Sequence, residues 1–160
     1  MGKLVRREDL QTFLKELRTE GKTIVTTNGC FDILHVGHVR YLQKTKTFAD
    51  KMIVCLNSDV SVKKIKGPDR PINNENDRAE ILCALACVDY VVLFDESSPE
   101  GLLGEIKPDV HTKGADYTLD TLPEAKIILA NGGRVEFISF VEGKSTTNVI
   151  KKIGAQGICK

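Results

Sequence analysis

The segment 28–42 contains residue types that could bind a phosphate chain. His35 and His38 are three positions apart, so on the first turn of a helix their rings would face the same ligand. Gly29 precedes them and lets the backbone approach a ligand closely. The first backbone N–H groups of a helix have no internal partner, and the helix dipole attracts an anion to them. This segment therefore predicts a phosphate site at the start of a helix.

The flanking sequence predicts the elements that would position these residues. Residues 23–27 are rich in β-branched side chains, which is typical of a strand. After the two histidines, Val39, Leu42 and Thr45 recur at helical spacing. The chain is expected to pass from a strand through a tight turn into a helix that begins beside His35 and His38.

A zinc site is the alternative reading of the same segment, because Cys30 and Asp32 lie near the two histidines in sequence. The spacing Cys-x4-His-x2-His differs from that of common zinc sites, which favours phosphate binding. Cys30 has no basic neighbour in sequence, so we expect its thiol to pack rather than to act as a nucleophile. A helix N-terminus disfavours imidazolium, so both rings should be neutral when the site is empty and gain protons when a triphosphate binds.

Composition narrows the class of protein. The chain has 160 residues, 41% of them hydrophobic and 28% charged, as in an ordinary globular domain. A net charge of +1 gives no reason to expect nucleic-acid or membrane-surface binding. There is neither an apolar run long enough to cross a bilayer nor a secretory signal, so a cytoplasmic protein is expected. The five cysteines form no CxxC pair and are interpreted as reduced thiols.

Strand-like and helix-like segments alternate along the chain. The alternation predicts a single-domain, Rossmann-like, doubly wound five-stranded parallel sheet, with right-handed crossovers. The expected domain covers 1–160, with an N-terminal helix in 1–22, a catalytic core in 23–153 and a tail in 154–160. The expected strands are 23–27, 52–56, 88–94, 109–112 and 134–141, and the expected helices include 6–20, one capped by Asn74 or Asn76, one that starts at Pro99, and 122–130.

The segment 60–73 is strongly basic and interrupted by helix breakers. Gly67, Pro68 and Pro71 argue against a continuous helix through it. A solvated surface loop is the simpler interpretation, but the segment follows a strand at the edge where ligands bind in parallel sheets. We therefore expect a basic flap that closes over a triphosphate, and its cations are Lys63, Lys64, Lys66 and Arg70.

Four groups that are distant in sequence follow expected strands or begin expected helices. They are the segment 28–38, Asn57 to Asp59 with the basic flap, Lys113 to Asp116, and Ser145 to Thr147. The carboxyl ends of parallel strands meet in one crevice, so these groups should form one pocket rich in anion donors. Such a pocket suits nucleotidyl transfer, in which a substrate phosphate is already ionised and needs no general base.

The string Asn28-Gly29-Cys30-Phe31-Asp32, followed by His35-Val36-Gly37-His38, resembles the signature of the HxGH nucleotidyltransferase superfamily. Within it, the chain is most similar to the heptose 1-phosphate adenylyltransferases over residues 24–153. Lys66-Gly67-Pro68-Asp69-Arg70-Pro71-Ile72 and Asp77-Arg78-Ala79 also match that family. Lys113-Gly114 with Asp116-Tyr117 looks like its nucleotide loop, beside the ribose and base, and Ser145-Thr146-Thr147 looks like its second phosphate motif.

The residues and the resemblance together assign the expected roles. Asp32 is a candidate Mg²⁺ ligand, with a helix-capping role as the alternative. Catalysis is expected from His35, His38, Lys66 and Arg78. Nucleotide binding is expected from Gly29, Cys30, Phe31, Asp32, Gly37, Lys113, Gly114, Asp116, Ser145, Thr146 and Thr147. Binding of the second substrate is expected from Asn28, Asp32, Asn57, Asp59, Lys63, Lys66, Arg70 and Arg78.

The resemblance implies an enzyme that joins ATP and heptose 1-phosphate, with Mg²⁺, to give ADP-heptose and pyrophosphate. A separate sugar kinase is the expected pathway partner, and association into a homo-oligomer is left open. The alternatives are a cytidylyltransferase for glycerol 3-phosphate or a similar alcohol phosphate, an FMN adenylyltransferase, and a non-catalytic nucleotide-binding regulator. Two departures bear on base and sugar choice: Lys144 precedes the Ser-Thr-Thr where related cytidylyltransferases carry Arg, and His111 stands where an aliphatic residue is usual.

Overall fold

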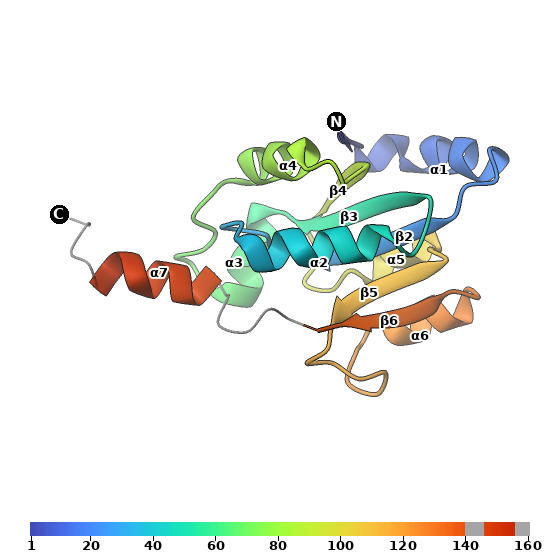
Figure 1. Ribbon diagram of the computed structural model, residues 1–160. Helices are drawn as coiled ribbons and strands as arrows, with labels where there is room; N and C mark the ends of the chain where they lie inside the picture. The colour runs from blue at the N-terminus through green and yellow to red at the C-terminus, as the bar shows by residue number, and fades with distance from the viewer. Residues whose placement is uncertain (140–145, 156–160) are drawn as a thin grey trace.

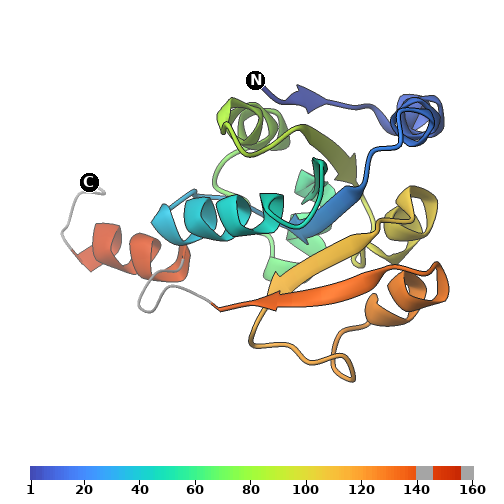
Figure 2. The ribbon, with the colours of Figure 1, turned by 45° about the vertical axis from the view of Figure 1, so that its right-hand side comes forward.

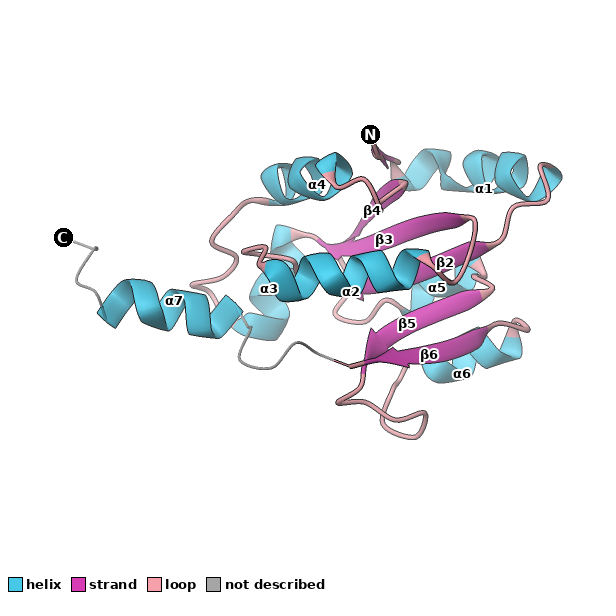
Figure 3. Cartoon of the chain, viewed as in Figure 1, coloured by secondary structure: helices cyan, strands magenta, loops and turns pink. Residues whose placement is uncertain are grey.

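The computed structural model describes residues 1–139 and 146–155. They form one parallel sheet with the strand order β1-β4-β3-β2-β5-β6 (Figures 1 and 3). The strands are β1 (Lys3–Leu4), β2 (Ile24–Gly29), β3 (Lys51–Asn57), β4 (Tyr90–Phe94), β5 (Val110–Gly114) and β6 (Arg134–Ile138).

Helices cover both faces of the sheet, as the turned view in Figure 2 makes clear. One core cluster joins α1, α5 and α6 to the sheet, and the other joins α2 and α4 to its opposite face. The helical elements are the 3₁₀ turn Arg7–Asp9 and the helices α1 (Leu10–Thr19), α2 (Val36–Lys46), α3 (Asp59–Lys66), α4 (Glu75–Ala84), α5 (Glu100–Ile106), α6 (Ala125–Ala130) and α7 (Thr146–Ala155). None of the helices in the described part of the chain is long and apolar enough to span a membrane.

The predicted doubly wound parallel sheet is confirmed, but the predicted number of strands is wrong by one. The additional strand is β1, in which Lys3 pairs with Tyr90 and Leu4 with Val91 at the edge of the sheet. A two-residue strand is too short to show an alternating or continuous apolar pattern, so no pattern of residues predicts it. Asn74 is the cap of α4, as one of the two alternatives predicted, because its side chain accepts hydrogen bonds from the backbone of Asn76 and Asp77.

The interpretation of 60–73 as one flap needs a correction, because its first half is helical. Ser58 caps α3 by accepting a hydrogen bond from the backbone N–H of Ser61, and the helix continues to Lys66. Gly67, with a φ of 97°, ends it in a conformation that other residues rarely adopt. The helix breakers thus act only from Gly67 onwards, and the lysines of the predicted flap lie on a helix while Arg70 lies on a loop.

The order of the strands creates a switch point between β2 and β5. From β2 the chain moves to β3 and β4 on one side, and β5 and β6 then fill the other side. In such sheets the crevice for a ligand lies beyond the carboxyl ends of the two central strands. Here those ends carry Asn28 and Gly29 on β2 and Lys113 on β5. The fold therefore brings together two of the predicted site segments.

A cluster of hydroxyl groups fixes α2 against the sheet on this side. The Tyr41 hydroxyl is 2.8 Å from Oγ1 of Thr27 and donates to Oγ1 of Thr112 at 3.1 Å. Oγ1 of Thr45 is 3.0 Å from the same Thr112 oxygen, and the three threonines are fully buried. Buried polar groups that satisfy one another fix relative positions more strictly than apolar contacts do. The cluster therefore sets the position of α2, which carries His38 one turn before Tyr41.

Thr112→Val should destabilise the protein by about 1–3 kcal/mol, because it leaves buried hydroxyls of α2 without their shared partner. Urea unfolding followed by circular dichroism would measure the change in the free energy of unfolding. Thr19→Val is the control, because the Thr19 hydroxyl is exposed and bonds only to Lys15 of its own helix. Equal stabilities for the two variants would contradict a positioning role for the cluster.

Candidate functional site

A cavity of about 570 Å³ lies at the carboxyl edge of the sheet, over the switch point. It is lined by residues from segments that are distant in sequence. Most of these segments are the ones predicted to form one pocket. The predicted site residues in its lining are Asn28, Gly29, Cys30, Phe31, Asp32, His38, Asn57, Lys66, Arg70, Lys113 and Thr146.

The other predicted site residues do not line this cavity or lie beyond the described structure. His35, Gly37, Asp59, Lys63, Arg78, Gly114 and Asp116 are absent from the lining of the cavity as the structure describes it. Ser145 lies outside the described residues, as does Lys144, and the side chain of Thr147 is likewise not described. Of the Ser-Thr-Thr motif, Thr146 at the start of α7 is therefore the residue that can be placed. Its hydroxyl donates to the carbonyl of Ile33, which holds this helix start beside the turn after β2.

The two histidines meet as predicted, although only His38 reaches the cavity. His35 is the N-cap residue of α2, and its ring stacks on that of His38 with centroids 3.9 Å apart. On its other side, His38 makes an edge-to-face contact with Phe31 at 5.3 Å. Burial, with a smaller contribution from His35, lowers the pKa of His38 to about 4. His38 is therefore neutral near pH 7, as predicted, but the main cause is burial of its ring and not the helix N-terminus.

The turn after β2 shows why a glycine and an aromatic residue stand together here. Phe31 has a φ of 43°, in the left-handed region that non-glycine residues seldom occupy. A Cβ at Gly29 would stand 3.0 Å from Cε2 of the Phe31 ring. Gly29 thus makes room for Phe31, in addition to the open backbone at the cavity that the sequence predicted. A strained residue at such a point is a frequent feature of functional sites.

Asp32 holds the loop 67–73 against the cavity. Its carboxylate accepts hydrogen bonds from Nε of Arg70 at 2.6 Å and from the backbone N–H groups of Ile72 and Asn73 at 2.8 and 2.9 Å. Burial alone would raise the pKa of Asp32, but these donors outweigh it and lower the pKa. Asp32 does not cap α2, because the cap position is His35. Both carboxylate oxygens already have donors, and the carboxylate is nearly inaccessible, so it does not fit the predicted role of an Mg²⁺ ligand.

Arg78 lies beneath the cavity rather than in it, which corrects the expectation that it contacts a substrate. Its side chain is fully buried, and its guanidinium donates to the carbonyls of Cys30, Asn57 and Asn73 at 2.6, 2.8 and 3.0 Å. It also forms an ion pair with Asp59 at 2.8 Å. One side chain thereby joins the turn after β2, the end of β3, the start of α3 and the loop before α4.

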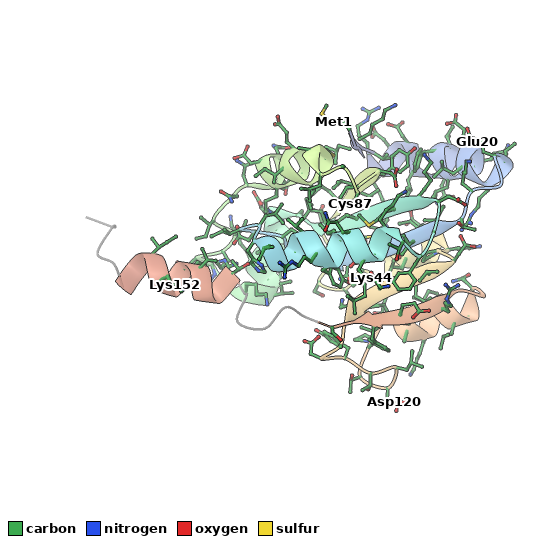
Figure 4. All side chains as sticks on the ribbon, viewed as in Figure 1. Met1, Glu20, Lys44, Cys87, Asp120 and Lys152 are labelled. Carbon is green, nitrogen blue, oxygen red and sulfur yellow. The ribbon has the colours of Figure 1, made fainter. Side chains whose placement is uncertain are left out.

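Lys113 reaches the cavity from β5, but it is paired with an acid that the sequence analysis missed. Its ammonium is 2.7 Å from Oδ1 of Asn28 and 2.7 Å from Oε1 of Glu124. Glu124 is buried beside the cavity at the end of the loop that follows β5; Asp120, labelled in Figure 4, lies on the same loop. In sequence, Glu124 could not be distinguished from an ordinary acidic residue at a helix start.

Most of the basic side chains in or beneath the cavity are paired with a carboxylate, so the unbalanced positive charge is smaller than the number of basic residues suggests. Arg70 is paired with Asp32, Arg78 with Asp59, and Lys113 with Glu124. Among the described residues that line the cavity, Lys66 is the cation for which no ion pair is found. Burial raises the pKa of the Cys30 thiol although Lys66 opposes the shift, which favours a packing role for this cysteine. An anion in the cavity would be attracted most strongly to Lys66.

Comparison with known proteins agrees with this geometry. Residues 26–152 match the family described as cytidylyltransferase-like. The chain is 50% identical over 152 residues to the bifunctional protein HldE of Syntrophotalea carbinolica and 49% identical to that of Haemophilus ducreyi. Each alignment covers 95% of this chain but only 31% and 32% of the relative, so the chain spans about a third of their length.

A solved structure resembles most of this chain. The lipopolysaccharide core biosynthesis protein of Thermoplasma volcanium is 31% identical and superposes with a TM-score of 0.63, over 78% of this chain and 100% of that one. The family match over residues 26–152 spans most of β2, the turn after it, and the strands β3 to β6. With its Rossmann-like sheet and its phosphate-binding residue types at the switch point, the chain belongs to the cytidylyltransferase-like family of nucleotidyltransferases.

Proposed function

We propose that this domain transfers the adenylyl group of ATP to a sugar 1-phosphate, with heptose 1-phosphate as the acceptor. The observation that carries the proposal is the cavity in which His38, Lys66 and the start of α7 at Thr146 meet over the switch point. The choice of heptose rests on the likeness to the HldE proteins, and the structural relative, named a lipopolysaccharide core biosynthesis protein, agrees with an acceptor that is a sugar. The products would be ADP-heptose and pyrophosphate.

In this reaction a phosphate oxygen of the sugar phosphate attacks the α-phosphorus of ATP. The bond from that phosphorus to the bridging oxygen breaks in line, and pyrophosphate leaves with the electron pair. The attacking oxygen is already ionised, so no residue has to remove a proton from it. Catalysis then depends on holding two anions together and on neutralising charge that moves onto the leaving group.

His38 and Lys66 are the side chains assigned to the leaving group. Lys66 supplies a cation that no other described group neutralises, and it stands at the end of α3 beside the cavity. His38 is neutral in the empty site and can take up a proton when the triphosphate arrives. His35 would act through its stacking contact with His38, and Arg78 and Asp32 would act by holding the walls of the cavity.

The proposed reaction would use Mg²⁺ with ATP, and the ion would neutralise part of the charge of the phosphates. Asp32 does not fit as its ligand, and the described residues contain no group of three or more His, Cys, Asp or Glu side chains that could hold a metal ion. This fits a metal that stays on its substrate, because Mg²⁺ commonly keeps several waters and uses few protein ligands. A kinase reaction must supply the sugar phosphate, whichever chain carries it.

Pyrophosphate release across a panel of substrates would test the proposed function. We expect release with ATP and heptose 1-phosphate, and at least about a hundredfold lower kcat/KM with CTP or with glycerol 3-phosphate. Preference for CTP and glycerol 3-phosphate would identify a cytidylyltransferase for an alcohol phosphate, and preference for FMN with ATP would identify an FMN adenylyltransferase. Binding of a triphosphate without release for any acceptor would support a regulator instead.

Lys66→Ala should lower kcat/KM by about 30- to 300-fold, because it removes the cation for which the described lining of the cavity offers no ion pair. Steady-state kinetics with ATP and the preferred acceptor would measure the loss. Lys15→Ala is the matched control, because Lys15 is an exposed lysine on α1. A loss of less than threefold for Lys66→Ala would show that the triphosphate is held elsewhere.

ATP binding near pH 6 should take up close to one proton on His38. The empty protein keeps His38 neutral with a pKa of about 4, and a bound polyphosphate should raise that pKa well above the pH of the experiment. Calorimetric titration in buffers of different ionisation enthalpy would measure the uptake. His38→Ala should abolish the proton uptake and reduce turnover by about a hundredfold or more. Its affinity for ATP should stay within about tenfold of that of the unmodified protein. Equal uptake by the variant would assign the proton to another group.

A further inference from the structure

A buried carboxylate beside an anion-binding cavity needs an explanation, because it opposes the binding of anions. Glu124 is 3% exposed and lies in the cavity wall opposite the side that carries Lys66. Burial alone would raise the pKa of Glu124, but the His111 ring behind it and the Lys113 ammonium beside it lower that pKa. The carboxylate is therefore ionised near neutral pH.

The charge of Glu124 is balanced by Lys113 rather than by the neighbouring histidine. His111 is fully buried behind the carboxylate, and its Nε2 is 3.7 Å from Oε1 of Glu124, beyond hydrogen-bond distance. Its Nδ1 is 2.8 Å from the Thr26 hydroxyl. Burial lowers the pKa of His111, and Lys113 adds to that effect while Glu124 opposes it. A neutral His111 leaves Lys113, at 2.7 Å, as the counter-charge of Glu124.

Lys113 is held in one geometry by three neighbours. Its ammonium bonds to Asn28 on β2 and to Glu124, and it lies 5.3 Å from the centre of the Tyr117 ring. An ammonium has three N–H donors, and two of them are used by the oxygens of Asn28 and Glu124. The third N–H of Lys113 remains for a substrate, and the positive charge of this ammonium is balanced by the Glu124 carboxylate.

The two lysines of the cavity therefore differ in charge and in position. Lys66 follows β3 and Lys113 ends β5, on opposite sides of the central strand β2. Among the described residues of the lining, no ion pair is found for Lys66, whereas Lys113 forms part of a neutral pair. A ligand with an anionic tail and a neutral head would bind with its tail toward Lys66 and its head toward Lys113.

We propose that Glu124 is a positioning residue that acts through Lys113. It fixes the ammonium at the junction of β2 and β5 and cancels its charge, so that Lys113 donates a hydrogen bond to a neutral oxygen or nitrogen of the nucleoside. Without Glu124, Lys113 would attract the phosphate chain from the wrong end of the cavity, and the nucleotide would bind in unproductive orientations. This inference rests on the proposed function, because it assumes a nucleoside triphosphate in the cavity.

A double-mutant cycle on Glu124→Gln and Lys113→Met tests the proposal. The probes are inorganic tripolyphosphate, measured by calorimetry, and the kcat and KM for ATP. Glu124→Gln alone should bind tripolyphosphate about three- to tenfold more tightly than the unmodified protein and lose about tenfold or more in kcat/KM for ATP. In the Lys113→Met background, Glu124→Gln should change either quantity by less than about twofold, since a residue that acts through Lys113 has no effect in its absence.

A purely structural Glu124 predicts a different result. Its removal would weaken tripolyphosphate binding or leave it unchanged, and its effects would add to those of Lys113→Met; either outcome would overturn the proposal. Glu136→Gln is the matched control, because Glu136 forms an exposed ion pair with Arg134 on β6, away from the cavity. This variant should match the unmodified protein within about twofold in both measurements.

Two further provisions keep the result decisive. If Glu124→Gln does not fold, Glu124→Asp replaces it in the cycle. A loss of kcat/KM that appears in the unmodified protein but not in the Lys113→Met variant would support the proposal. Equal losses in both backgrounds would contradict it. If the unmodified protein binds ATP but adenylylates no sugar phosphate, the proposed function fails. The tripolyphosphate measurements then still decide whether Glu124 acts through Lys113.

Discussion

The buried guanidinium of Arg78 is the interaction on which the architecture of the site depends. It joins the backbone after β2, the end of β3 and the loop before α4, and it is paired with Asp59 at the start of α3. Backbone carbonyls at strand ends have no partners within the sheet, and here a charged donor satisfies two of them at once. Because the donor is enclosed, the segments it joins cannot separate without exposing an unpaired charge to an apolar environment.

The same principle of paired charges shapes the cavity above it. Asp32 and Glu124 each hold a cation in place, so Arg70 and Lys113 contribute geometry more than net charge. Within the described lining of the cavity, the attraction for an anion is thereby concentrated at Lys66. A pocket with all of its cations unpaired would bind a polyphosphate strongly in several orientations, whereas a pocket with one dominant cation favours one. Ion pairing thus gives the site a direction along which a nucleotide can lie.

The sequence was sufficient to predict the parallel sheet, the strand–turn–helix unit around His35 and His38, and most of the residues that line the cavity. These predictions rest on local periodicity and on the rule that strand ends share one edge. The pairing of Asp32 with Arg70 and of Glu124 with Lys113 could not be predicted, because each pair joins residues whose separation is set by the tertiary fold. Arg78 and Lys66 looked alike in sequence, and only burial distinguishes a cation that supports the walls from one that faces a ligand.

The hydroxyl cluster beneath α2 has a consequence for how such a domain can diverge. The hydrogen bonds among Tyr41, Thr45 and Thr112 form only when α2 has one position and one orientation on the sheet. If these side chains ended in methyl groups instead, α2 could shift slightly along the sheet. Substitutions in the core could then change the position of the helix during evolution. With the hydroxyls present, the end of α2 that carries His38 keeps its position. New ligand preferences would then arise in the loops around the cavity, where amino-acid replacements leave the hydroxyl cluster unchanged.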